Sequence, residues 1–208
     1  MRELRTALVA VLVLTAVFGL AYPLAMTGVA QVAFPGRADG SLVEREGRVV
    51  GSRLIGQDFS QDTGRMVEEG APVLEPDPRY FQSRPSVTGY AADATYFNNL
   101  GPNQQDLADQ LTELVDAYVA RERPYTPGLT AASVPADAAT TSASGIDPHI
   151  SERNGRIQAN RVARERSLPV GRVLELADEH ASRPLFGLGG PASINVLELN
   201  LALDEETS

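Results

Sequence analysis

The chain has 208 residues and a formal net charge of −9, with 27 acidic side chains against 18 basic ones. This balance argues against a nucleic-acid partner, which needs clustered cations to neutralise phosphates. All eighteen basic residues are arginine, and neither lysine nor cysteine occurs. That excludes a phosphate-loop lysine, a Schiff base, a thiolate nucleophile and a disulfide. Two histidines, His149 and His180, are too few for a histidine-rich metal site, so we expect no metal centre.

The run from Thr6 to Phe34 contains no charged side chain. A bilayer core needs roughly 20 apolar helical residues, so this run is long enough to span a membrane. We expect a transmembrane helix that Pro23 and the glycines bend without breaking. The alternative is a signal peptide cleaved near Gly28, but its apolar region would be shorter, roughly 7 to 15 residues. The pattern favours a retained anchor.

The flanks of this run predict its orientation. Arg2 and Arg5 precede it, and positive charges keep such an end in the cytoplasm, although Arg37 on the far side weakens the asymmetry. We therefore expect a single-pass protein of the inner or plasma membrane with a cytoplasmic N-terminus. Residues 1–35 would form that N-terminus and the transmembrane helix, and residues 36–208 one extracytoplasmic domain.

The first part of the domain reads as short strands and loops. Leu42 to Glu44 and Arg48 to Ile55 flank a turn at Gly47, which predicts a hairpin. The stretch from Asp58 to Pro78 is acidic and rich in glycine and proline, which predicts a loop. Further on, we expect Tyr80 and Phe81 to pack on the core and Arg84 to form a structural ion pair.

Three helices follow in the pattern. Asn103 is the expected N-cap of an amphipathic helix that ends near Arg123. The segment 126–144 has the composition of a linker. Ser151 is the expected N-cap of a helix ending near Glu165, and a further helix begins after Ser167. The positions expected to face inward are Leu107, Leu111, Leu114, Val115 and Tyr118 in the first helix, Ile157 and Val162 in the second, and Val170, Val173, Leu174 and Ala177 in the third.

Alternating leucines dominate the last segment, from Asn195 to Asp204. Alternation with polar residues predicts a strand with one buried face. Together with the hairpin and the helices, this strand predicts an α+β fold behind one N-terminal transmembrane helix.

Ser144, Asp147 and His149 are the residue types of a nucleophilic triad. Three residues within six positions would have to converge inside one turn, and no G-x-S-x-G elbow is present. The residues alone therefore predict no catalytic group. A membrane-anchored extracytoplasmic hydrolase that uses Ser144 and His149 stays open as the alternative.

Seven sequence motifs in order resemble the KdpC family, the C subunit of the potassium-transporting P-type ATPase. They are Gly51 to Gln57, Tyr80-Phe81 with Ser83 to Ser86, Asn99 to Gly101, Val134 to Asp137, Ser142 to Ser151, Gln158 with Arg161 to Ala163, and Asn195 to Asn200. They extend over nearly the whole chain, beginning with the single span. Asn154-Gly155 departs from the small helix formers usual in the family.

The resemblance implies a non-catalytic subunit of a high-affinity ATP-driven potassium uptake complex. Its partners would be a channel-like potassium-binding subunit, the P-type catalytic subunit and a small single-span subunit. The family is described as a catalytic chaperone that raises the ATP affinity of the catalytic subunit. ATP is thus a possible ligand by resemblance only, and potassium would be handled by the partners.

Five residues in these motifs are candidate partner or loop-ordering contacts. They are Arg84, Asn99, Asp147, His149 and Gln158. Buried hydrogen bonds inside the domain explain most of them equally well. In the span, four residues are small enough to let a partner helix approach closely, namely Ala16, Gly19, Ala25 and Gly28.

Overall fold

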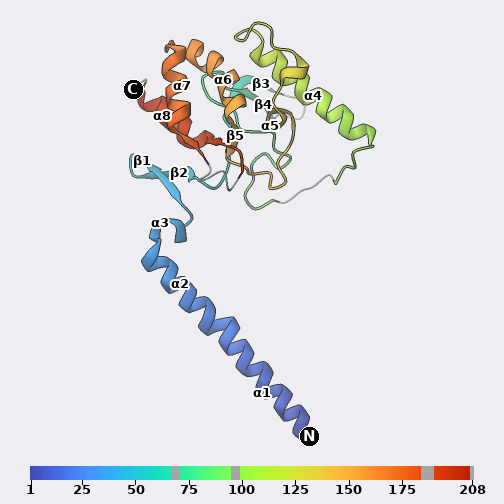
Figure 1. Ribbon diagram of the computed structural model, residues 1–208, viewed down its shortest axis with the longest axis vertical. Coiled ribbons are helices and arrows are strands. Elements are labelled where there is room, and N and C mark those ends of the chain that lie inside the picture. Colours follow the sequence, from blue (N-terminus) through green and yellow to red (C-terminus); the bar gives the residue numbers. More distant parts are fainter. Residues whose placement is uncertain (67–70, 95–98, 184–189, 207–208) are drawn as a thin grey trace. The chain divides into compact units, whose positions relative to one another are not determined.

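The computed structural model describes residues 1–66, 71–94, 99–183 and 190–206 (Figure 1). The chain divides into two compact units, Met1–Ser52 and Arg53–Ser208. Each unit is described by itself below. Helices and sheet are both present, in agreement with the predicted mixed class.

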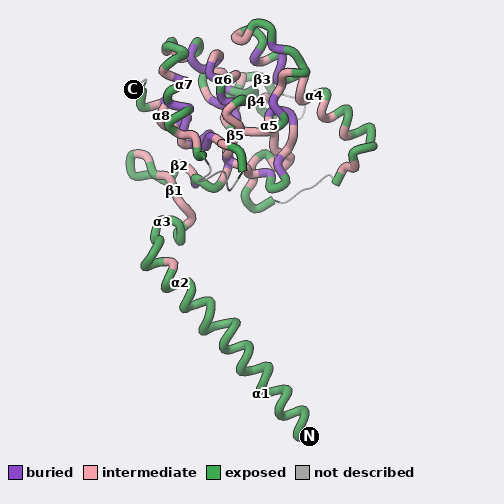
Figure 2. The backbone as a smooth tube through the Cα atoms, viewed as in Figure 1, coloured by how far each residue is buried: buried purple, intermediate pink, exposed green. Residues whose placement is uncertain are grey.

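One long helix makes up most of the first unit. It consists of α1 (Arg2–Ala16), a π-helical turn (Val17–Ala21) and α2 (Tyr22–Ala33). The most apolar 18-residue stretch within Arg2–Ala33 has a mean hydropathy of 2.3, and none of that stretch is buried in the protein, as the exposed tube in Figure 2 shows. Among the described residues, this is the one helix long and apolar enough to cross a membrane, where the sequence predicts one. A short helix, α3 (Pro35–Ala38), follows.

The predicted hairpin is confirmed. Strands β1 (Leu42–Arg45) and β2 (Arg48–Ser52) pair antiparallel. Glu46 and Gly47 connect them with φ values of 52° and 75°. A two-residue turn with both residues at positive φ matches the twist of the flanking strands, which is why glycine suits the second position.

The loop predicted from Asp58 to Pro78 is wrong, because it contains a second hairpin. Strands β3 (Ser60–Met66) and β4 (Pro72–Pro76) pair antiparallel. The two prolines of β4 stand at its ends. A proline costs a strand least at its first residue or at an edge, where no ladder N–H is needed, so these prolines bound the strand instead of breaking it.

The first predicted helix is confirmed, with its start shifted. α4 (Gln105–Glu122) begins after Gln104, so Asn103 is not its N-cap. Of its predicted apolar stripe only Tyr118 is buried, while the four preceding positions are half-buried. The first three turns of α4 therefore gain less from packing than the pattern suggests.

The segment 126–144 is not an unstructured linker. It forms a 3-10 turn (Ala131–Ser133) and α5 (Ala136–Ala139), and Ala138 is buried with Tyr118 and Leu129 in a small cluster. The small residues that suggest disorder by composition here allow close packing.

Helix α6 (Glu152–Glu165) begins at Ser151 as predicted, and the Ser151 side chain accepts a hydrogen bond from the Asn154 N–H at 3.1 Å. Gly155 is buried in its first turn, and a Cβ there would lie 2.6 Å from the Ile194 Cδ1 atom. The glycine thus lets the helix approach Ile194 closely.

The helix predicted after Ser167 is confirmed with its start shifted: α7 (Val170–Glu179) begins after Pro169, which is its N-cap. Val173 and Ala177 are buried, and Leu174 packs at the edge of the core. Val170 is 40% exposed, so its predicted inward position is wrong. It occupies the first residue of the helix, beyond the part that the core covers.

The central sheet of the second unit has the order β5-β7-β6 and is antiparallel. Its strands are β5 (His149–Ser151), β6 (Ala181–Ser182) and β7 (Ser193–Asn195). The core between this sheet and α6, α7 and α8 consists of Phe81, Ile150, Ala159, Val162, Ala163, Val173, Leu176, Ala177, Ile194, Val196, Leu199 and Leu203.

The predicted C-terminal strand is wrong. Its first residue, Asn195, ends β7, and Val196–Glu206 forms the helix α8. The buried positions Val196, Leu199 and Leu203 are spaced i, i+3 and i+7, which is a helical face. Leucine, glutamate and alanine are strong helix formers, and Asn195 accepts a hydrogen bond from the Glu198 N–H at 3.2 Å, as an N-cap does.

Candidate functional site

A short extended segment around Phe81 and Gln82 crosses the second unit next to its core. The side-chain amide of Asn200 accepts from the Phe81 N–H and donates to the Phe81 carbonyl, each at 2.9 Å. Gln158 does the same to Gln82, at 2.8 and 3.0 Å. These two amides replace a neighbouring strand, so the buried backbone of this segment is satisfied without a sheet.

A buried ion pair lies beside this segment. The Arg161 Nε atom donates to both carboxylate oxygens of Glu122 at 3.1 Å, and neither side chain is more than 1% exposed. The Arg161 Nη1 atom donates to the carbonyls of Pro78 and Tyr80, and its Nη2 atom donates to Gln158. Burial lowers the pKa of Arg161, and the Glu122 carboxylate opposes that shift. The pair thus ties α4 and α6 to the crossing segment.

Arg84 forms an ion pair inside the second unit, as predicted. Its Nη1 atom lies 2.9 Å from the Asp147 Oδ2 atom, and its Nη2 atom donates to Thr140 and to the Thr141 carbonyl. The Tyr90 hydroxyl donates to the Arg84 carbonyl at 2.6 Å. Arg84 therefore joins the segment after β4 to both ends of the loop between α5 and β5.

Asp147 and His149 lie together at the start of β5. The Asp147 Oδ1 atom accepts from the His149 backbone N–H at 3.0 Å, and the His149 Nδ1 atom lies 3.5 Å from it. Hydrogen bonding to the His149 ring lowers the pKa of Asp147 most, and burial of the carboxylate opposes this shift. The His149 backbone N–H and Arg84 lower the pKa further, and the result is a value of about 2. The carboxylate stays ionised in its ion pair at any physiological pH.

This geometry predicts a pH-dependent loss of stability. The folded-state pKa of Asp147 lies below its ordinary value of 3.8. The carboxylate therefore stabilises the fold fully above about pH 4, and this contribution, about 1–2 kcal/mol for a partly exposed group, is lost as the pH falls through about 2. Urea unfolding should show Asp147→Asn less stable than wild type at about pH 5 and nearly equal at about pH 1.5. Asp116→Asn, an exposed carboxylate of α4, should show no such convergence.

Gly56 lets two of the motif loops touch. Its N–H donates to the Ile146 carbonyl at 2.7 Å, and a Cβ at Gly56 would lie 2.6 Å from the Asp147 carbonyl oxygen. Backbone on both sides of this contact cannot rotate away as a side chain can. The resemblance motifs that contain Gly56 and Asp147 are thus adjacent in space.

We predict that Gly56→Ala destabilises the domain by about 1–3 kcal/mol, because the added methyl group overpacks a backbone contact. Gly171→Ala is the matched control, since a Cβ there meets nothing within 4 Å. It replaces a glycine in the first turn of α7 and should stabilise by up to about 1 kcal/mol. Urea unfolding of both variants measures the difference, and equal effects would contradict the close contact.

The triad residues do not assemble. The Ser144 hydroxyl accepts from the Ile146 N–H at 3.2 Å and lies 3.5 Å from the Ser142 hydroxyl. Within the described ranges no hydrogen bond joins Ser144 to His149, and no group of three or more metal-ligating side chains occurs. The serine thus serves its own turn, and no observation favours the hydrolase alternative.

The five candidate contact residues fall into three places. Arg84, Asp147 and His149 form one cluster, and the His149 side chain is 41% exposed. Asn99 is exposed with φ 49° on a separate loop, and Gln158 is buried in the core of the unit. Sequence reasoning missed Glu122, Arg161 and Asn200 as organising residues, since their type gives no sign that they are buried.

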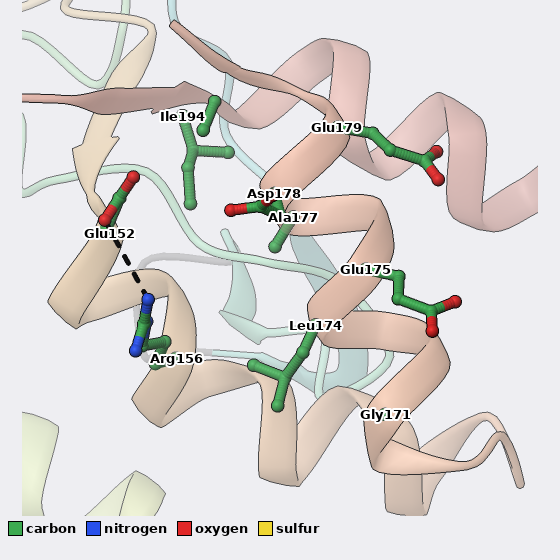
Figure 3. Close-up of a pocket in the computed structure, with 10 residues that line it drawn as sticks. Glu152, Arg156, Gly171, Leu174, Glu175, Ala177, Asp178, Glu179 and Ile194 are labelled. Carbon is green, nitrogen blue, oxygen red and sulfur yellow. Dashed lines mark ion pairs between the residues drawn. The ribbon is translucent and has the colours of Figure 1, made fainter. Parts of the chain in front are cut away.

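A surface cavity of about 540 Å³ lies beside α6 and α7 (Figure 3). Leu174, Asp178 and Ile194 face the space toward α6, and Glu152 and Arg156 line the opposite side. Arg183 binds both Glu152 and Asp178, so the charges at this cavity are already paired. None of the predicted contact residues lines it.

The sequence pattern of the family described as "K+-transporting ATPase, c chain" matches residues 4–205. The chain belongs to the KdpC family. A potassium-transporting ATPase KdpC subunit from Cereibacter sphaeroides strain KD131 is 46% identical over 204 residues, which cover 98% of this chain and 97% of the relative. Those of Bradyrhizobium diazoefficiens and Polaromonas naphthalenivorans are each 47% identical, and cover 97% and 93% of the relatives.

Family membership confirms the resemblance drawn from the seven motifs. The chain is a subunit of the multi-subunit Kdp potassium-transporting ATPase and not its catalytic one. The apolar helix Arg2–Ala33 fits the membrane association of such a complex. The ordered loops at Arg84, Gly56 and Asp147 are where the family motifs meet in this chain.

Proposed function

We propose that the chain is a non-catalytic subunit that stabilises the Kdp assembly from one side of the membrane. Residues 1–35 form a cytoplasmic N-terminus and a single membrane span, and residues 36–208 form an extracytoplasmic domain. Arg2 and Arg5 at the start of the apolar helix support this orientation. The partners are a channel-like potassium-binding subunit, the P-type catalytic subunit and a small single-span subunit.

The observation that carries this proposal is the internal pairing of the motif residues. Arg84 is engaged with Asp147 and the Thr140–Thr141 backbone, and Gln158 with Gln82. Side chains whose polar atoms are bonded inside the domain order its loops, and few of their atoms remain to react with a substrate. Asn99, which is exposed, and His149, which is half-buried, are the proposed partner contacts among the five candidates. Gln158 acts by ordering the segment around Gln82.

As proposed for the family, the chain also raises the ATP affinity of the catalytic subunit. With the N-terminus inside, the domain lies on the side opposite cytoplasmic ATP. The effect on ATP affinity would then pass through the transmembrane helix. ATP is not proposed as a direct ligand of this domain.

Reconstitution tests the function. The complex purified with this chain should show potassium-stimulated ATPase activity, and the complex prepared without it should lose that activity or require more ATP for half-maximal rate. The rate is measured over a range of ATP concentrations at fixed potassium. Identical ATP dependence and potassium stimulation in both preparations would overturn the proposal.

Protease protection tests the orientation. Protease added to intact spheroplasts should remove the domain that follows residue 36 and leave the membrane-embedded fragment. An antibody tag placed at the C-terminus reports the loss. Full protection of the tag until the membrane is permeabilised would reverse the proposed topology.

A further inference from the structure

The transmembrane helix changes its hydrogen-bond register at its centre. In the π-helical turn Val17–Ala21 the Tyr22 N–H donates to the Val17 carbonyl, five residues back, in place of the Phe18 carbonyl. Single π turns inside α-helices occur often at functional sites. Here the next residue is Pro23, which has no N–H. The π turn therefore takes away the regular donor of the Phe18 carbonyl, and Pro23 takes away that of the neighbouring Gly19 carbonyl, four residues before it.

The Phe18 carbonyl has no alternative donor nearby in its own helix. It would take its regular donor from position 22, whose N–H is engaged with Val17, or from position 23 in a continued π register, where proline has none. Threonine and serine hydroxyls can reach back three or four residues along a helix. Ala21 and Tyr22 stand at those positions, and a tyrosine hydroxyl lies at the far end of its ring.

Leaving the Phe18 carbonyl without a hydrogen bond costs much free energy because of where it lies. The uncharged run has eleven residues before the π turn, 6–16, and thirteen after it, 22–34, so the turn lies at mid-membrane depth. No water is available there, and an unsatisfied backbone group in hydrocarbon costs several kcal/mol. Gly19, the next residue, has no side chain to cover the carbonyl. A Cβ at Gly19 would meet only the Thr15 Cγ2 atom, at 3.8 Å.

We propose that the Phe18 carbonyl accepts a hydrogen bond from a hydroxyl or amide side chain of another transmembrane helix of the complex, packed against Gly19. This deepens the proposed function, on which it rests for the membrane placement and the assembly. Small residues let helix backbones approach in membranes, and polar side chains then bond across the interface. The π turn supplies the acceptor, and the glycine supplies access to it.

Co-purification of the full-length tagged chain with the other Kdp subunits tests this contact. Gly19→Leu should reduce the recovered subunits at least about tenfold, and the smaller Gly19→Ala by an intermediate factor. Leucine at position 19 meets no clash within its own helix, so the loss reports the partner. The matched control is Ala10→Leu, which lies nine residues earlier and so on the opposite face, and should recover within about twofold of wild type. Carbonate extraction checks that every variant is inserted.

Pro23→Ala separates the hydrogen bond from simple crowding, because alanine restores an N–H that reaches the Phe18 carbonyl in a continued π register and the Gly19 carbonyl in the α register. In that background Gly19→Leu should cost about threefold or less, since effects through one shared contact are not additive. An equal cost in both backgrounds would show packing alone and overturn the inference. So would wild-type recovery of Gly19→Leu, as expected if water satisfied the carbonyl. Failure of the wild-type chain to co-purify with the other Kdp subunits would instead contradict the proposed function.

Discussion

Replacing Arg161 by methionine should destabilise the protein by about 3–5 kcal/mol, because the Glu122 carboxylate loses its buried counter-charge and two buried carbonyls lose their donor. The charge that Glu122 keeps is Arg121, whose side chain is 28% exposed and whose Nε atom lies 2.8 Å from the Glu122 Oε1 atom. Glu122 is fully buried, and Arg161 also satisfies the carbonyls of Pro78 and Tyr80. Urea unfolding of the full-length chain in detergent, followed by circular dichroism, measures the loss. The chain has no tryptophan, so secondary structure is the convenient signal.

Arg156→Met is the matched control on the same helix. The Arg156 side chain is 71% exposed, and its nearest carboxylate, on Glu152, lies 4.0 Å away. Such surface pairs contribute little, so the control should change stability by less than about 1 kcal/mol. A second variant, Arg161→Met with Glu122→Leu, should recover part of the loss, because no fully buried charge then remains and Arg121, which also pairs with Glu122, is 28% exposed and can reach water. If Arg161→Met matched the control, the buried pair would not organise this unit.

Leu203→Ala should cost about 2–5 kcal/mol, the range for removing a leucine side chain from a packed core. Leu203 is fully buried in the last turns of α8, in the same cluster as Val173 and Leu199. The same unfolding measurement applies. The size of the loss depends on how far α7 and α8 can close over the space left behind.

Leu201→Ala distinguishes the helix from the strand that the sequence pattern suggests. Leu201 is only half-buried, so its loss should be clearly smaller than that of Leu203. In a strand, residues two apart share one face and both leucines would be equally buried. Equal losses for the two variants would therefore restore the strand and contradict α8.

Two of the wrong predictions, the C-terminal strand and the loop from Asp58 to Pro78, have a common physical cause. Leucines at every second position from 197 to 203 satisfy a strand pattern, and Val196, Leu199 and Leu203 satisfy a helical one at the same time. Proline breaks a strand in its interior but is tolerated at its ends, which is where Pro72 and Pro76 stand in β4. In both cases the local pattern permits two states, and packing against distant segments selects one.

The candidate site, too, is predicted from the sequence in one part and decided by tertiary contacts in another. The motifs predict which loops matter, and the ion pair of Arg84 follows from its type and setting. The sequence does not predict that Asn200 and Gln158 hold the backbone of Phe81 and Gln82 over 119 and 76 positions of chain. Asparagine and glutamine are mostly exposed, so the residue type alone predicts a surface position. Only the tertiary structure shows that these two are buried and which groups they bind.

The sequence by itself determined the apolar helix that is long enough to span a membrane, the tight hairpin at Gly47, the N-cap at Ser151 and membership in the KdpC family. Each of these four features depends on local chemistry or on an ordered set of motifs, and none of them requires knowledge of distant contacts. The tertiary structure alone decided the helical state of Val196–Glu206, the buried pair of Arg161 and Glu122, and the contact of Gly56 with Asp147. These features depend on which segments are brought together in space, because burial turns an ambiguous pattern or an ordinary polar residue into a specific interaction.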